Sequence, residues 1–191
     1  MTKPALQNHL CVAAESQVVI VDIQTRLAGA MQADDRLRVI RNTGILIQAA
    51  GILNVPLIAS EQYPKGLGPT EEDVAWHFPE NLEAVEKSCF ACTGEPAFAE
   101  ALNRHGRRQV ILAGMETHVC VLQTAMELKA DGYAVFVAND AVCSRKESHH
   151  RNALERLREA GVVVTNIESV LFEWVRDARH EQFKAVSALI K

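Results

Sequence analysis

Short apolar runs rich in β-branched residues alternate with helical patterns along this chain. Each strand candidate is a continuous apolar run, which is typical of strands buried on both faces of a parallel sheet. Strands that alternate with helices predict an α/β fold with helices on both sides of that sheet. The strand candidates are residues 17–22, 55–60, 84–88, 109–114, 133–138 and 162–166, and the helical patterns cover 34–52, 96–106, 117–132, 147–161 and two shorter segments in 168–191.

The bulk properties limit the possible partners. A length of 191 residues fits one domain, expected over 1–191, and a net charge of −4 without a basic stripe argues against nucleic acid. No apolar run approaches the roughly 20 residues that a membrane span needs, and residues 1–17 lack the apolar core of a signal peptide. Five cysteines without regular spacing do not indicate a disulfide framework. We therefore expect a cytoplasmic protein with reduced thiols and no membrane partner.

Reactive side chains follow three different strand candidates. Asp22 ends the first, Lys87 lies at the end of the third, and Cys120 lies in the first helical turn after the fourth. Ligands of parallel sheets bind at the carboxyl ends of the strands. A helix start stabilises a thiolate, so Cys120 is expected to be a nucleophile of low pKa. Asp22 would take the thiol proton, Lys87 would keep the thiolate and carboxylate charged, and helix-start amides would receive an oxyanion. Taken singly, Asp22 and Lys87 are more often solvated or structurally paired.

Together these motifs resemble a known family. The segments VVIVDIQ, VEKSCF and AGMETHVCVLQTA are similar to the isochorismatase-like cysteine hydrolase superfamily, and SEQYPKGLGPT and RHEQFKAVSALIK resemble its isochorismatase-domain-containing subgroup. The resemblance implies a three-layer αβα sandwich with a six-stranded parallel sheet, a Rossmann-like isochorismatase fold. It also implies an Asp-Lys-Cys triad at Asp22, Lys87 and Cys120, in which Cys120 attacks a carbonyl and water hydrolyses the thioester.

The resemblance further implies how the oxyanion is held. The backbone amides of Glu116 and Cys120 would form the oxyanion hole, next to a cis Met115–Glu116 peptide bond. An ordinary turn between strand and helix is the alternative at this point. Thr117 is a plausible N-cap whose hydroxyl could compete for the Cys120 amide, and the sequence leaves this open.

Two departures from other family members narrow the chemistry. Nicotinamidases of this superfamily carry an Asp-x-His metal cluster after the second strand, where this chain reads ASEQYPKG, so we expect neither metal nor cofactor. True isochorismatases lack the cysteine and cleave a vinyl ether. The presence of Cys120 therefore favours an amidase-type, metal-independent hydrolase of a small amide-like (C–N) substrate.

The region around the expected triad predicts a partly aromatic pocket. Residues 61–82 form a long segment rich in Pro and Gly, which is usually functional or mobile. Aromatic side chains in 76–78, with Tyr63 and Phe90, would make the pocket apolar. His118 lines either the pocket or an interface, whereas His149 and His150 are expected on the surface. The predicted substrate contacts are Gln24, Tyr63, Phe90, Thr117 and His118.

Two other functions compete with hydrolysis. The chain could be a catalytically quiet interaction protein on the same scaffold, because fold does not guarantee function. The C-x-x-C at 89–92 could be a redox dithiol. It could also be half of a structural zinc site, but the chain has no second cysteine pair to complete one. No G-x-G-x-x-G follows a strand, which excludes a dinucleotide-binding enzyme. Apolar side chains in the tail predict a homodimer or larger assembly: Leu171, Phe172, Trp174, Phe183, Val186, Leu189 and Ile190.

Overall fold

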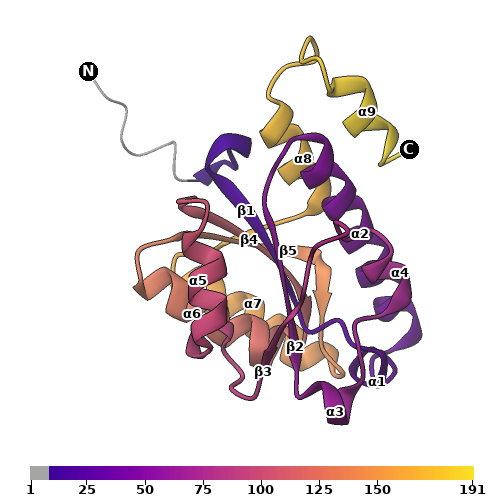
Figure 1. The fold of residues 1–191 in the computed structure, drawn as a ribbon, viewed down its shortest axis with the longest axis vertical. Coiled ribbons are helices and arrows are strands. Elements are labelled where there is room, and N and C mark those ends of the chain that lie inside the picture. The colour runs from indigo at the N-terminus through magenta and orange to yellow at the C-terminus, as the bar shows by residue number, and fades with distance from the viewer. Residues whose placement is uncertain (1–8) are drawn as a thin grey trace.

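The protein is built around a six-stranded parallel sheet with the order β3-β2-β1-β4-β5-β6 (Figure 1). The computed structural model describes residues 9–191, so the first eight residues of the expected 1–191 domain lie outside the described part. The parallel sheet and its helical cover confirm the predicted fold class. The strands are β1 (Ser16–Val21), β2 (Leu57–Gln62), β3 (Val85–Lys87), β4 (Gln109–Met115), β5 (Ala134–Cys143) and β6 (Val163–Thr165).

Helices cover both faces of this sheet. The longer ones are α2 (Ala33–Ile52), α5 (Pro96–Asn103), α6 (Leu122–Ala130), α7 (Glu147–Glu159), α8 (Ile167–Val175) and α9 (Phe183–Ala188). Short helical segments lie in the connections: α1 (Thr25–Ala28), α3 (Pro64–Leu67), α4 (Glu72–Ala75), the 3₁₀ turns η2 (Ala13–Glu15) and η3 (Cys92–Gly94), and the π-helical turn η4 (Thr117–Val121).

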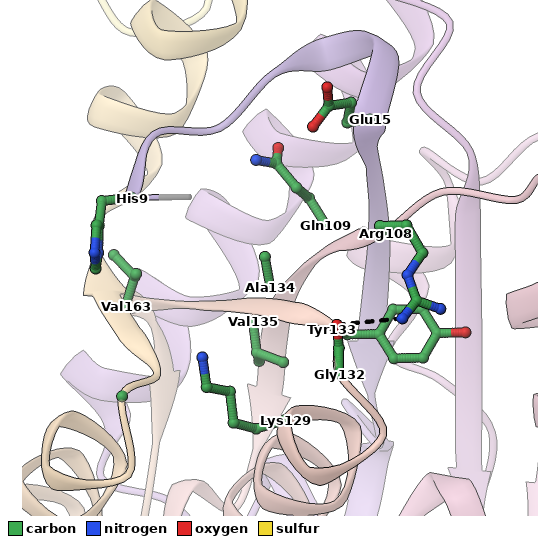
Figure 2. A pocket seen from close by; sticks show the side chains of 11 residues that line it. His9, Glu15, Arg108, Gln109, Lys129, Gly132, Tyr133, Ala134, Val135 and Val163 are labelled. Atoms are coloured by element: carbon green, nitrogen blue, oxygen red, sulfur yellow. Dashed lines mark hydrogen bonds between the residues drawn. The ribbon is translucent and has the colours of Figure 1, made fainter. Parts of the chain in front are cut away.

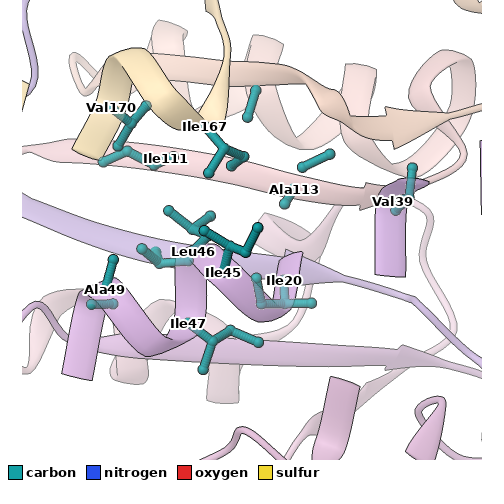
Figure 3. Close-up of a cluster of buried hydrophobic side chains, with 14 of the residues drawn as sticks. Ile20, Val39, Ile45, Leu46, Ile47, Ala49, Ile111, Ala113, Ile167 and Val170 are labelled. Atoms are coloured by element: carbon teal, nitrogen blue, oxygen red, sulfur yellow. The ribbon is translucent and has the colours of Figure 1, made fainter. Parts of the chain in front are cut away.

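Two apolar cores separate the three layers. Strand side chains alternate between the faces, so Val18 and Ile20 of β1 join one core and Val19 and Val21 the other. Figure 3 shows the first core, in which Leu46 of α2 and Val170 of α8 face the sheet. Side chains of α5, α6 and α7 fill the second core, among them Phe98, Leu128 and Leu157.

The strand order reverses between β1 and β4. In open α/β sheets such a switch point opens a crevice at the carboxyl ends of the strands. α1 and α3 lie at this end of the molecule, whereas α8 and α9 lie at the opposite end (Figure 1). The fold therefore brings the residues that follow β1 and β4 to one place.

Close approach of β4 to β1 depends on Gly114. Its φ is 138°, and a Cβ at this position would lie 2.0 Å from the Val21 carbonyl oxygen. The register between β4 and β5 shifts between Leu112 and Gly114, and β5 is longer than the predicted 133–138. Only glycine fits this approach without moving β1.

The structure describes both surface segments that the sequence singles out, and it corrects the expectation for the tail. The 61–82 segment contains α3 and α4 and is pinned, since the Thr70 amide and hydroxyl each donate to Glu61 Oε1 at 2.7 Å. In the tail, Leu171, Trp174 and Val186 are buried in the first core, so they do not form an exposed patch. The apolar periodicity of the tail reflects packing on the sheet.

Candidate active site

A buried ion pair lies at the switch point. Asp22 directly follows β1 with a φ of 50°, and Lys87 is the last residue of β3. Lys87 Nζ lies 2.7 Å from Asp22 Oδ2, and both side chains have 0% exposure. A positive φ in a non-glycine residue persists only where its surroundings hold it. The structure therefore fixes this carboxylate firmly at the end of the sheet.

The Lys87 ammonium is further held by three oxygen acceptors. It donates to Gln62 Oε1 at 2.7 Å and to the carbonyls of Cys89 and Phe90 at 3.3 and 3.1 Å. Burial opposes its charge, but the charge and the hydrogen bond of Asp22 act in the opposite direction, and the Lys87 pKa is raised. Lys87 consequently stays protonated and acts as a fixed positive charge.

The Cys120 thiol lies next to this ion pair. Cys120 sits in η4, just after β4, is 5% exposed, and lies near enough to Asp22 and Lys87 for both charges to act on its pKa. Burial raises its pKa most, the Asp22 charge raises it further, and Lys87 acts in the opposite direction. The expected low pKa of the Cys120 thiol is therefore wrong for the resting protein, because burial and the Asp22 charge together outweigh the Lys87 charge. The thiol keeps its proton, with a carboxylate positioned to accept it.

The turn that carries Cys120 has an unusual hydrogen-bond pattern. The Glu116 carbonyl accepts from the amides of Val119 at 3.0 Å and Val121 at 3.3 Å, on either side of the Cys120 amide. The preceding Met115–Glu116 peptide bond is cis. Thr117 does not cap the helix, since its hydroxyl contacts His150 Nδ1 at 2.9 Å. The question about competition for the Cys120 amide is thus answered by the position of His150.

Residues 116–118 are tied to the connection between β5 and α7. Glu116 Oε2 accepts from the Arg145 amide at 2.9 Å and from Arg145 Nε at 3.1 Å. His118 Nδ1 lies 2.9 Å from Ser144 Oγ. Burial lowers the pKa of His118, and also that of His150. His150 is half-buried instead of lying on the surface as expected, because α7 turns it toward Thr117.

The predicted substrate contacts fall into different environments. Gln24 is buried and makes internal bonds only, accepting from the Gln62 amide at 2.8 Å and donating to the carbonyls of Gln62 at 3.1 Å and Gly68 at 2.7 Å. Tyr63 and Phe90, in the segments that follow β2 and β3, are 59% and 54% exposed. The structure therefore gives Gln24 a role in joining the segments that surround Asp22.

The aromatic residues 76–78 do not border the triad. Trp76 lies with Leu37 of α2 and Leu189 in a surface groove of about 490 Å³. Phe78 packs against the first core. This part of the expected pocket is wrong, because the segment after α4 folds back along α2 and away from Cys120.

A separate cavity lies at the opposite end of the sheet, where the strands begin. It has a volume of about 340 Å³ and is bordered by Gln109 and Ala134, which begin β4 and β5. Figure 2 shows Arg108 beside Tyr133, whose ring centroid is 4.4 Å from the guanidinium carbon. Asp22, Lys87 and Cys120 lie at the carboxyl ends of the strands, so this cavity is distinct from their site.

Three further properties follow from the described residues. Within 9–191, no group of three or more His, Cys, Asp or Glu side chains is arranged to hold a metal ion. No helix in the same range is long and apolar enough to cross a membrane. All five cysteines, at positions 11, 89, 92, 120 and 143, are free.

Sequence reasoning missed several residues of this site. Ser60 and Gln62 contact Asp22 and Lys87, and both lie at the carboxyl end of β2, where the rule that selected Asp22 also applies. Arg145 and His150 hold the Cys120 turn from a distant segment, and no local pattern marks them.

Comparisons with known proteins identify the family. The isochorismatase domain model matches residues 16–169. Isochorismatase family protein 1B of Dictyostelium discoideum is 35% identical over 179 residues, which cover 92% of this chain and 86% of that protein. The MAR1 ribonuclease of Caenorhabditis elegans superposes with a TM-score of 0.88 at 34% identity, over 95% of this chain and 92% of that one. The YcaC gene product of Escherichia coli, an octameric hydrolase of unknown specificity, gives a TM-score of 0.88 at 25% identity, over 99% and 91%.

The chain therefore belongs to the isochorismatase family, as the sequence motifs predicted, and has the hydrolase fold of that family.

Proposed function

We propose that this protein is a metal-independent cysteine hydrolase that cleaves a small amide-like substrate through a thioester. The observation that carries the proposal is the fully buried Asp22–Lys87 pair beside the buried thiol of Cys120, on which both charges act. A buried thiol, a carboxylate acceptor and a fixed cation are the groups that nucleophilic acyl transfer requires. The family membership supports a hydrolytic activity.

In the first half-reaction, Asp22 takes the Cys120 proton as Sγ bonds to the substrate carbonyl carbon. The resulting oxyanion is received by the Glu116 and Cys120 amides, which is consistent with the Glu116 carbonyl bonding to residues on either side of Cys120. The C–N bond then breaks, and the leaving amine takes the proton from Asp22. Lys87 stays charged throughout and keeps Asp22 ionised before each proton transfer.

In the second half-reaction, water attacks the thioester carbonyl. Asp22 takes a proton from this water, the C–S bond breaks, and the Cys120 sulfur regains the proton from Asp22. The products are a carboxylic acid and the regenerated thiol. Neither half-reaction needs a metal or cofactor.

We place the substrate between the residues that follow β2, β3 and β4. Tyr63 and Phe90 are exposed aromatic side chains that can cover a small molecule, and His118 is the partly exposed polar group nearest in sequence to Cys120. Thr117 is buried and bonded to His150, so it acts through the turn that it stabilises.

The decisive experiment is a hydrolysis screen of small amides, carbamoyl compounds and esters with wild type and Cys120→Ala. We expect turnover that is lost in Cys120→Ala and retained in Cys143→Ala, since Cys143 is buried at the end of β5. Mass spectrometry of wild type that is quenched and digested under turnover should show an acyl adduct on the peptide that contains Cys120. Turnover that survives in Cys120→Ala would rule out the mechanism.

The competing activities are tested with the same variants. One structural neighbour is named as a ribonuclease. A net charge of −4 supports a small-molecule substrate over RNA. Degradation of RNA by wild type but not by Cys120→Ala would replace our substrate class, and a screen without any Cys120-dependent product would favour the quiet interaction protein.

We also propose a homo-oligomer. An octameric relative with 25% identity over 99% of this chain supports assembly. The exposed apolar side chains of Trp76 and Leu37, with exposures of 83% and 65%, offer a surface for it.

A further inference from the structure

Ser60 holds Asp22 at two points. Its carbonyl accepts from the Asp22 amide at 3.2 Å, and its hydroxyl donates to Asp22 Oδ1 at 2.8 Å. Ser60 is 2% exposed and lies on β2, opposite Val21 of β1. Since Lys87 takes Oδ2, both carboxylate oxygens have a fixed partner. Ser60 thus constrains the backbone and the side chain of the proposed general base together.

Cys92 directs the Ser60 hydroxyl. Its thiol lies 3.4 Å from Ser60 Oγ, and its backbone amide donates to Thr124 Oγ1 at 2.9 Å. Cys92 is fully buried, and burial raises its pKa, so it retains its proton and donates to the serine oxygen. A serine hydroxyl has one hydrogen to donate. With Cys92 as donor, that hydrogen points to Asp22.

We propose that Ser60 and Cys92 are positioning residues that keep the negative charge on Asp22 while Cys120 is protonated. This inference rests on the proposed function, since it assigns the supports of the same base. It also gives a role to the C-x-x-C at 89–92. The carbonyls of Cys89 and Phe90 hold the Lys87 ammonium, and Cys92 supports Asp22 through Ser60. The two halves of this turn therefore fix the two partners of the ion pair.

The arrangement predicts the direction in which the proton moves between Asp22 and Cys120 when the Ser60 hydrogen bond is removed. Asp22 and Cys120 compete for one proton, because the Asp22 carboxylate is the proposed acceptor of the Cys120 proton. The Ser60 hydrogen bond stabilises the Asp22 carboxylate, which leaves the proton on Cys120. Removal of this bond moves the proton toward Asp22 and increases the fraction of Cys120 thiolate. A hydrogen bond to a charged group corresponds to about 1 to 2 pH units of such a shift.

The probe is the rate of Cys120 alkylation by iodoacetamide as a function of pH. The tryptic peptide Gln109–Lys129 contains Cys120 and no other cysteine, so mass spectrometry reports its modification alone. In wild type the rate should rise as the pair loses its first proton and then reach a plateau. In Ser60→Ala the midpoint of this rise should move up by about 1 to 2 pH units, and the plateau should rise about 10- to 100-fold.

Five variants distinguish a positioning role from a general loosening of the structure. Ser60→Thr keeps the hydroxyl and should restore the wild-type midpoint, and Cys92→Ser, which keeps a donor, should do the same relative to Cys92→Ala. Cys92→Ala should shift the midpoint in the direction of Ser60→Ala, by less. Ser16→Ala and Cys11→Ala remove buried groups elsewhere and should leave the midpoint unchanged.

The outcomes distinguish the two proposals. Coincident midpoints for wild type, Ser60→Ala and Cys92→Ala would overturn this inference, and so would a uniform rate increase at every pH, because that reports unfolding. Turnover that survives in Cys120→Ala would overturn the proposed function itself, whatever the midpoints show. Thermal melts of each variant establish the pH range over which it remains folded.

Discussion

Lys87 Nζ and Asp22 Oδ2 lie 2.7 Å apart, and neither side chain is exposed to solvent. Removing one partner of a buried pair leaves the other charge without compensation, which costs more than losing an exposed pair. Because 65 residues separate the two, the contact also joins distant parts of the chain.

We expect Lys87→Met to lower the free energy of unfolding by about 3–5 kcal/mol, since it leaves Asp22 charged in a buried site. The double variant Lys87→Met with Asp22→Asn should recover part of this loss. Urea denaturation measures the free energy of unfolding of the wild type, of Lys87→Met and of the double variant. Arg151→Ala, which breaks an exposed i,i+4 pair with Glu147, is the control and should cost less than about 0.5 kcal/mol. A Lys87→Met loss as small as that of the control would contradict the burial argument.

Asp22→Asn should make Cys120 more reactive but abolish hydrolysis. The Asp22 charge raises the Cys120 pKa, whereas Lys87 lowers it, so the variant retains only the favourable charge. The alkylation rate of Cys120 near neutral pH should therefore increase, although no general base remains. Asp35→Asn, which removes a partly exposed carboxylate paired with Arg38, should change neither rate. Slower alkylation in Asp22→Asn would show that the assigned charges are wrong.

Gly114→Ala should destabilise the protein by at least about 2–3 kcal/mol, because its φ of 138° and the Val21 carbonyl at 2.0 Å both oppose a Cβ. Gly51→Ala is the matched change in α2, where a Cβ meets nothing within 4 Å. It should stabilise by about 0.5–1 kcal/mol. Thermal or urea denaturation compares the two, and equal effects would disprove the close approach of β4 to β1.

Stability should fall as the pH drops below the ordinary histidine range. Burial lowers the His150 pKa in the folded state, so the unfolded chain binds more protons there. Stability from neutral His150 is therefore present above its unfolded pKa, and it is lost as the pH falls from that value through the lower folded pKa. His150→Gln should flatten the dependence of unfolding free energy on pH between about 7 and 5. His105→Gln, at an exposed position after α5, should leave the slope as it is in wild type.

The wild-type chain should sediment above its monomer mass of 21.1 kDa. Leu37→Glu with Trp76→Glu should shift it toward the monomer, since both side chains are highly exposed and border one groove. Leu10→Glu, at a position that is 40% exposed, is the control for an added charge. A monomer in the wild type at micromolar concentration would refute the proposed oligomer.

The fold is predictable from the sequence because its determinants are local. The central strands β1, β4 and β5 contain apolar runs, and the rule that ligands gather at strand ends selects Asp22, Lys87 and Cys120 from the sequence alone. The Cys120 pKa is not predictable in this way, because it depends on how Asp22 and Lys87 divide their charges in space. The position of Trp76 is not predictable for a related reason. The sequence of a loop shows that a residue is apolar, but not which part of the fold that residue packs against.

The amide of Gln24 has a consequence for how β1 can end. Asp22 has a positive φ, so the chain turns away from β2 after β1 ends. The backbone of Gln62 on β2 then has no β1 backbone beside it to bond to. The Gln24 carboxamide accepts from the Gln62 amide and donates to the Gln62 carbonyl, so it stands in for the missing peptide unit. The amide and the carbonyl of Gln62 thereby both keep a hydrogen-bond partner where β1 ends beside β2. At this point a side-chain amide takes the place that a backbone amide holds in a regular strand, so β1 can end and the chain can turn toward the site.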